Sequence, residues 1–111
     1  MRKIISVGSA GQFVKEFCET VRPNGLGCDW GMDLEQIDAQ TGKQQVLQGN
    51  LDPLCLLRGG VTLEKEVRYI VQQTKLGRHI FNLGHGILPE TPIEHVELML
   101  DTLRAAEKES A

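Results

Sequence analysis

The chain has 111 residues, of which 41% are hydrophobic and 24% are charged, and its formal net charge is −3 at pH 7. This length fits one domain or less. The mildly acidic charge, with Lys and Arg dispersed, gives no electrostatic basis for binding nucleic acid or a membrane surface. No apolar run approaches the roughly 20 residues of a membrane span. Three widely spaced cysteines, an odd number, argue against a disulfide framework and predict a cytoplasmic protein.

In chain order, short β-rich runs alternate with amphipathic helical stretches. The expected strands span residues 3–7, 26–30, 45–49 and 79–83. The expected helices are one after the capping box at 9–12 that ends before Pro23, one from Asp33 to Gly42, one from Thr62 to Gly77, and one from Thr91 onward. Residues 54–60 are expected to form a loop or one helical turn, and the polar tail 107–111 is expected to fray.

Three of these helices show apolar side chains at helical spacing, so each is expected to bury one face. The predicted faces are Phe13, Val14, Phe17 and Val21 on the first helix, Leu63, Val67, Ile70, Val71 and Thr74 on the third, and Ile93, Val96, Leu100 and Leu103 on the last. No hairpin signal separates the strand–helix units, so the strands are expected to be parallel with right-handed crossovers.

An α/β fold with about four β/α units fits two architectures. One is a small doubly wound sheet, and the other is a partial TIM (β/α)8 barrel, here a half-barrel. A half-barrel covers only one face of its sheet with helices. It is therefore expected to need the missing half of the barrel or a second copy of itself.

The strongest candidate for a functional residue is His85, which follows the last strand between Gly84 and Gly86. The two glycines permit a tight turn and leave the imidazole unshielded. Strand ends are where α/β enzymes build their sites, so His85 is expected to contact a ligand or substrate. His79, at the entrance of the same strand, is expected to be structural. His95 is expected to be exposed to solvent.

A weaker candidate is the helix start at residues 8–11. Free backbone amides near Ser9 and Gly11, together with the helix dipole, could hold a carboxylate or phosphate. Asp29 lies at another strand end and could act as a base, as a ligand or as a partner for a backbone amide, while Trp30 beside it is expected to pack. Asp52 before Pro53 is typical of an Asx turn. No Cys or His pair has metal-ligand spacing, so no metal site is predicted.

Three strings of the sequence together resemble the uroporphyrinogen decarboxylase family. They are Leu47-Gln48-Gly49-Asn50-Leu51-Asp52-Pro53, the run Ile80-Phe81-Asn82-Leu83-Gly84-His85-Gly86-Ile87-Leu88-Pro89, and Gly27-Cys28-Asp29-Trp30, which is similar to the family's Gly-Leu-Asp-Trp. Their order and spacing agree with the C-terminal third of the family's barrel. The chain departs from the family pattern at Val7-Gly8-Ser9, where a basic residue is usual, and at Gly31, where Thr is usual.

The resemblance implies a decarboxylase of tetrapyrrole synthesis that uses no cofactor. Such an enzyme converts the four acetate side chains of uroporphyrinogen to methyl groups, giving coproporphyrinogen and CO2, through protonation of a pyrrole ring. It also implies a homodimer, and it places His85 in the substrate cleft. The family's arginine-rich N-terminal segment, its pyrrole-binding aspartate and its cleft tyrosine have no counterpart here. The chain is thus expected to be a truncated or split product, or an expressed fragment, that is inactive alone.

Two alternatives accompany this interpretation. The chain could be a non-catalytic half-barrel that self-associates or binds tetrapyrroles, because the family's acid and arginine residues are missing. It could also be a fragment of the related zinc- and corrinoid-dependent methyltransferases. That reading is weaker, because those proteins usually carry a Cys where His85 stands.

Overall fold

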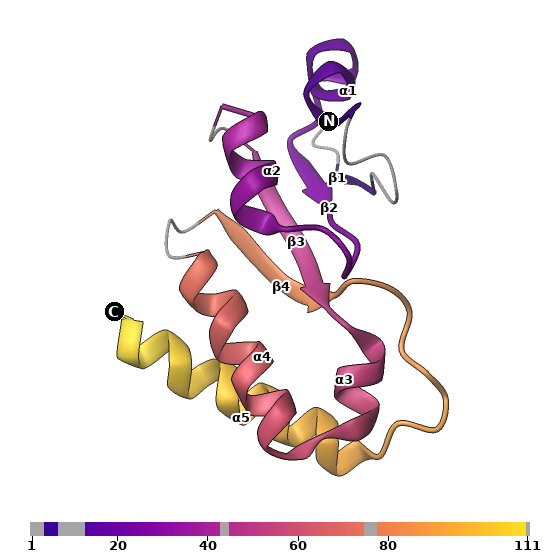
Figure 1. Cartoon of the computed structure of the whole chain (residues 1–111), viewed down its shortest axis with the longest axis vertical. Helices are drawn as coiled ribbons and strands as arrows, with labels where there is room; N and C mark the ends of the chain where they lie inside the picture. The colour runs from indigo at the N-terminus through magenta and orange to yellow at the C-terminus, as the bar shows by residue number, and fades with distance from the viewer. Residues whose placement is uncertain (1–3, 7–12, 43–44, 75–77, 111) are drawn as a thin grey trace.

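Four parallel strands alternate with helices in a computed structural model, which describes residues 4–6, 13–42, 45–74 and 78–110 (Figure 1). The strands are β1 Ile4–Ser6, β2 Gly25–Gly27, β3 Val46–Leu51 and β4 His79–Leu83. The helices are α1 Val14–Val21, α2 Leu34–Gln40, α3 Pro53–Arg58, α4 Gly60–Gln73 and α5 Ile93–Ser110. The strand order in the sheet is β1-β2-β3-β4, and every pairing is parallel. The predicted α/β alternation is confirmed.

The described helices contribute their buried side chains to one face of the sheet. Leu26, Leu47 and Leu51 point to that face and are at most 4% exposed. They share one core with Val14 of α1, Leu34 and Ile37 of α2, Leu56 of α3, and Leu63, Val67 and Ile70 of α4. A doubly wound sheet carries helices on both faces, whereas a barrel carries them only outside. The arrangement therefore matches an open part of a barrel.

The opposite face of the sheet, which we call the inner face, is open among the described residues. Side chains alternate along a strand, so the neighbours of the buried leucines point to this face. Ile4 of β1 is 51% exposed and Ile80 of β4 is 43% exposed. Ser6 and Asn82 on the same face are also exposed.

Two predicted element boundaries were wrong near the ends of β2 and β3. The strand expected over 26–30 is β2, at Gly25–Gly27, because residues 29–32 form a turn in which the Met32 amide donates to the Asp29 carbonyl at 3.1 Å. The strand expected to end at Gly49 continues to Leu51, because β3 stays paired with β4 as far as Leu51↔Leu83.

The segment expected to be a loop or one turn is the helix α3, and α4 begins at Gly60, ahead of the expected cap Thr62. The Asp52 side chain accepts a hydrogen bond from the Leu54 amide at 2.9 Å, and Pro53 occupies the first turn of α3. Both features favour a helix start. Gly59, with φ of 68°, then separates α3 from α4.

The first and last helices pack differently from the prediction. At α1, Val14 is buried and Phe17 packs on the core, but Phe13 is 53% exposed and Val21 is 42% exposed.

The face of α5 also differs. Ile93 is 72% exposed and Leu100 is 37% exposed, although both were expected on the buried face. The residues that pack on the core are Val96, Leu98, Met99 and Leu103, and Ala106 is 4% exposed. The shift follows from the neighbours of α5, which are α3 and α4 rather than the sheet. Residues 107–110 lie within α5; fraying of this last turn stays a prediction about dynamics.

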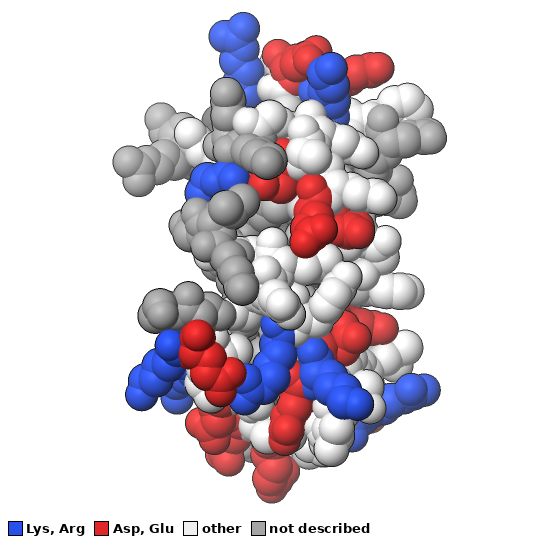
Figure 2. Space-filling model, turned by 60° about the vertical axis from the view of Figure 1, so that its left-hand side comes forward, with Lys and Arg blue, Asp and Glu red and all other residues white. Residues whose placement is uncertain are grey.

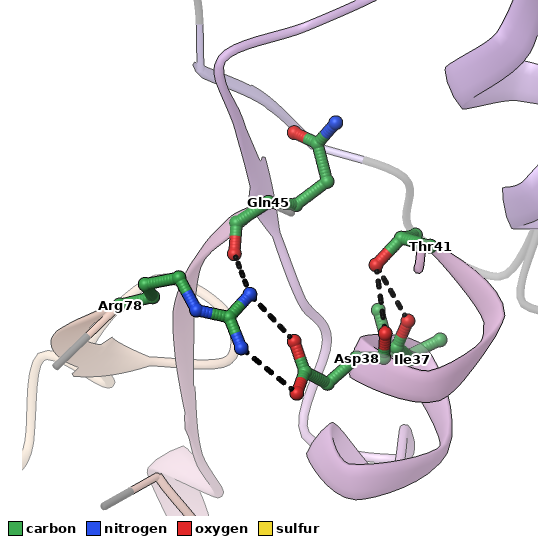
Figure 3. Close-up of polar contacts among 5 residues, drawn as sticks. All are labelled: Ile37, Asp38, Thr41, Gln45 and Arg78. Carbon is green, nitrogen blue, oxygen red and sulfur yellow. Dashed lines mark hydrogen bonds and ion pairs between the residues drawn. The ribbon is translucent and has the colours of Figure 1, made fainter. Parts of the chain in front are cut away.

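A polar cluster joins α2 to the amino-terminal ends of β3 and β4 (Figure 3). The two terminal guanidinium nitrogens of Arg78 contact the two carboxylate oxygens of Asp38 at 3.1 and 3.3 Å. The same guanidinium donates to the Gln45 carbonyl at 3.4 Å. The Thr41 hydroxyl bonds the Ile37 carbonyl at 2.9 Å at the end of α2. This end of the sheet is opposite to the end where strand-end sites form.

Charged side chains of both signs are interspersed on the face shown in Figure 2. No described helix is long and apolar enough to cross a membrane.

Candidate functional site

The carboxyl ends of β2, β3 and β4 bring together three segments, residues 28–32, 50–52 and 83–86, which we call the carboxyl rim. The Gly84 amide donates to the Leu51 carbonyl at 2.7 Å, and the Cys28 amide donates to the Gln48 carbonyl at 2.7 Å. Asn50 and Asn82 are register partners. The rim thus forms because backbone hydrogen bonds between neighbouring parallel strands continue into the segments that follow them.

Asn50 holds the first rim segment in place. Its side-chain amide donates to the carbonyls of Asp29 at 3.0 Å and Met32 at 2.6 Å, and the residue is only 7% exposed. The strand expected over residues 45–49 ends before Asn50, and no role was predicted for this side chain. Its partners lie 18 and 21 positions earlier in the chain, so no local signal identified it.

Gly84 contacts the same segment from the other side. A Cβ atom on Gly84 would lie 2.2 Å from the Trp30 backbone nitrogen and 2.8 Å from the Trp30 Cβ. No side chain fits in that space, so glycine is required here for close approach. Trp30, expected to pack, is 53% exposed at the rim.

His85 follows Gly84 at the rim and is exposed to solvent. No hydrogen bond or ion pair of its side chain occurs within the described residues. Gly86 is open as well, since a Cβ there would meet nothing within 4 Å. His85 therefore lies at the strand end, as predicted. Substrate contact by His85, Gly84 or Gly86 stays a prediction.

The two candidate carboxylates serve local structure. Asp29 accepts a hydrogen bond from the Trp30 amide at 2.8 Å through its Oδ1 atom. Asp52 caps α3, as its Asx-turn prediction indicated. The second candidate site, the anion contact at Ser9 and Gly11, lies outside the described residues.

The other two histidines are anchored to backbone carbonyls. His79 Nε2 lies 2.5 Å from the Gly49 carbonyl oxygen and therefore carries the donated proton. Burial lowers the pKa of His79 below its ordinary value, and the Gly49 hydrogen bond and Glu107 only partly oppose this. His95 Nδ1 bonds the Leu56 carbonyl at 2.9 Å, and its ring packs on Gly59. His95 is half-buried, so the prediction that it is solvent-exposed was wrong.

A groove of about 530 Å³ lies outside the sheet, between residues 30–33, α3 and α4. Its lining includes Trp30, Asn50, Arg58, Glu66 and Tyr69, and His85 does not line it. The groove therefore borders the rim next to α3 and α4, and His85 lies outside its lining.

The cysteines are free thiols, and burial raises the pKa of each. The pKa of Cys28 rises to about 11 through burial and the proximity of Cys18. Within the described residues, no group of three His, Cys, Asp or Glu side chains could hold a metal ion.

The sequence of the chain matches the model of the family described as uroporphyrinogen decarboxylase (URO-D) over residues 4–106. The chain belongs to the uroporphyrinogen decarboxylase family. The match includes β1 to β4 and most of α5, so the whole carboxyl rim falls within it.

Curated relatives named uroporphyrinogen decarboxylase match most of this chain. The protein of Hyphomonas neptunium is 40% identical over 97 residues, which is 87% of this chain and 28% of the relative. The protein of Mesorhizobium japonicum is 44% identical over 98 residues, with the same coverage of 87% and 28%. The protein of Chloroflexus aggregans is 45% identical over 82 residues, 72% of this chain and 23% of the relative. The chain thus spans about a quarter of the length of these relatives.

A methyltransferase from Methanosarcina mazei has a similar structure, with a TM-score of 0.61 at 21% identity. The similarity covers 96% of this chain and 42% of that one. At this identity the likeness concerns the fold alone. Together with the family match it establishes the partial barrel, which the sequence analysis predicted as one of two architectures.

Proposed function

We propose that this chain forms the C-terminal part of a uroporphyrinogen decarboxylase barrel and provides one wall of its substrate cleft. The complete site would convert uroporphyrinogen to coproporphyrinogen by releasing CO2 from the four acetate side chains, without a cofactor. Family membership over residues 4–106 supports the reaction class. The order of the three resembling strings supports the C-terminal position.

The observation that carries the proposal is the position of His85. It is exposed at the carboxyl rim, directly after a glycine that is fixed against Trp30 and Leu51. The imidazole therefore stands on a rigid support and remains free to meet a ligand. A protonated imidazole there would form a charge-assisted hydrogen bond with a substrate carboxylate. The substrate class, a tetrapyrrole with several carboxylates, offers such groups.

The second part of the proposal is that activity requires a partner polypeptide. The chain covers about 28% of the length of its relatives, and the inner face of its sheet is open among the described residues. A cleft with one wall cannot surround a macrocycle or exclude water from it. The remaining strand–helix units of the barrel would supply the other wall.

Complementation tests this proposal directly. The chain is mixed with a polypeptide that carries the preceding part of the Mesorhizobium japonicum relative, and coproporphyrinogen formation is measured. We expect activity from the mixture and none from either part alone. Absence of activity, with both parts shown to be folded and associated, would overturn the proposal.

His85→Asn then tests the assigned residue in the complemented enzyme. Loss of a charge-assisted hydrogen bond of about 1.5–3 kcal/mol predicts a fall in kcat/KM of roughly 10- to 150-fold. Arg104→Gln, which removes an exposed cation from α5, is the matched control and should leave kcat/KM unchanged. An unchanged kcat/KM for His85→Asn would remove this residue from the site.

A further inference from the structure

One row of the inner face carries the side chains expected of a barrel interior. Ile4, Gly25 and Val46 occupy one register row across β1, β2 and β3. Bulky β-branched side chains therefore come from the first and third strands, and glycine comes from the strand between them. A Cβ on Gly25 would lie 3.2 Å from the Ile4 side chain and 3.0 Å from the Val46 carbonyl oxygen. The space beside Gly25 is already filled by its neighbours.

Barrel interiors are built from layers of four side chains, each layer supplied by alternate strands and dominated by branched residues. The row of Ile4 and Val46 supplies two such side chains, which is half of one layer. The next row joins Ser6, Gly27, Gln48 and Ile80, with Ile80 at the far edge of the sheet. Ile4 and Ile80 are 51% and 43% exposed, so these layers are unfinished in the single chain.

The edges of the sheet fit the same interpretation. The strand order follows the chain order, so β1 and β4 are the two edges, and neither has a second strand partner among the described residues. A two-fold rotation about the barrel axis preserves the direction of every strand. It would place β4 of one copy beside β1 of the other at both seams, in parallel. Four strands per copy then give the eight that a closed barrel contains.

We propose that, without a complementing polypeptide, two copies of this chain associate through their inner faces and strand edges into a two-fold symmetric (β/α)8 barrel. The occupant of the open face is thus a second copy. The copy provides two further strands with branched side chains for the Ile4–Val46 layer and removes both open edges. Such closure is the general way in which sheets avoid exposed edges.

The mass of the purified chain in solution tests the association. Sedimentation or light scattering at several loading concentrations is expected to give twice the chain mass of 12.3 kDa. Ile80→Asp places a carboxylate on the inner face and should shift the protein to the monomer mass. Ile93→Asp changes an apolar side chain of α5 that is 72% exposed on the helical side. This matched control should keep the dimer mass.

Cross-linking tests the seam itself and does not depend on the folding of Ile80→Asp. Copies with Ser6→Cys are mixed with copies with Asn82→Cys and treated with a short bis-maleimide. A cross-linked dimer that forms efficiently only in the mixture is expected, because Ser6 lies on β1 and Asn82 on β4. A mixture of Ile93→Cys with Asn82→Cys is the control and should not cross-link. The native cysteines, of which Cys28 and Cys55 are buried and Cys18 is partly exposed, set the background in the unmodified chain.

Two results would overturn the proposal. One is a monomer with a cooperative thermal transition at every concentration, because the open face would then be stable in water. The other is a dimer that persists in folded Ile80→Asp and gives no cross-link across the β1–β4 seam, because the association would then use the helical side. Neither measurement involves substrate, so failure here leaves the decarboxylase proposal separately testable.

Discussion

Gly84 and Trp30 touch through their backbones, although β3 lies between the strands that precede them. A Cβ atom on Gly84 would stand 2.7 Å from the Trp30 Cα. The loop after β2 therefore crosses the end of β3 and reaches the end of β4. Asn50, near the end of β3, donates two hydrogen bonds to backbone carbonyls of this crossing loop. The support of His85 thus depends on residues from all three strand ends.

The first prediction concerns this close approach. Gly84→Ala would force the Trp30 backbone to move and should lower the free energy of unfolding by about 1–3 kcal/mol, as overpacking does. Gly86→Ala, where a Cβ meets nothing within 4 Å, should change it by less than about 0.5 kcal/mol. Urea unfolding of the two variants measures the difference. Equal free energies of unfolding for the two variants would show that the Trp30 backbone moves away from the added Cβ atom without loss of stability.

The second prediction concerns the Asn50 side chain. Asn50→Ala removes two hydrogen bonds from a residue that is 7% exposed, so we expect a loss of about 1–3 kcal/mol in the free energy of unfolding. Asn82→Ala, at the paired position of β4, removes an exposed side chain that bonds only the next amide in the chain. It should cost less than about 0.5 kcal/mol. Faster amide exchange at residues 30–32 in Asn50→Ala alone would locate the effect in the crossing loop.

Periodicity and capping signals in the sequence were enough to predict the alternation of strands and helices. Leu63, Val67 and Ile70 form the buried stripe of α4 as expected, because helical spacing decides which side chains can share a face. The strand-end position of His85 followed from an apolar run that ends at glycine. These features are local, so a single sequence contains them.

Features that depend on distant contacts could not be predicted in the same way. His95 bonds the Leu56 carbonyl 39 residues earlier, and the face of α5 is set by its packing on α3 and α4. The early end of β2 follows from a turn that Asn50 fixes from another strand. In each case the deciding partner lies on a different element, so spacing along the chain gives no signal.

The third prediction concerns pH. Burial lowers the pKa of His79 in the folded protein below its ordinary value of 6.5. As the pH falls below about 6.5, the unfolded chain binds a proton that the folded protein resists, so the unfolded state gains stability. The contribution of neutral His79 to the free energy of unfolding is therefore fully present above pH 6.5. It is lost progressively as the pH falls from 6.5 to the lower pKa of His79 in the folded protein.

Comparison with His79→Gln isolates this titration from that of the carboxylates. The free energy of unfolding of the two proteins is measured from pH 8 down to pH 5, and their difference is plotted against pH. We expect the original chain to lose stability relative to His79→Gln as the pH falls below 6.5. A difference that is constant over this range would mean that His79 titrates alike in both states.

The fourth prediction concerns Arg78 and Asp38, which join β4 to α2 (Figure 3). Their side chains are 27% and 14% exposed and meet through two nitrogen–oxygen contacts at 3.1 and 3.3 Å. A partly buried, two-point ion pair is held in one geometry and is poorly screened by water. A double-mutant cycle with Arg78→Gln and Asp38→Asn should therefore give a coupling of roughly 1–3 kcal/mol.

The exposed pair of Arg104 and Asp101 on α5 provides the matched control. Its side chains are 72% and 76% exposed, and the charged atoms are 3.9 Å apart. The same cycle should give less than about 0.5 kcal/mol, as is usual for surface pairs three residues apart on a helix. Raising the salt concentration should remove a larger fraction of the coupling energy of Arg104 with Asp101 than of the coupling energy of Arg78 with Asp38. Equal couplings would show that the contact between β4 and α2 is as well solvated as the surface pair, and that packing alone joins α2 to the sheet.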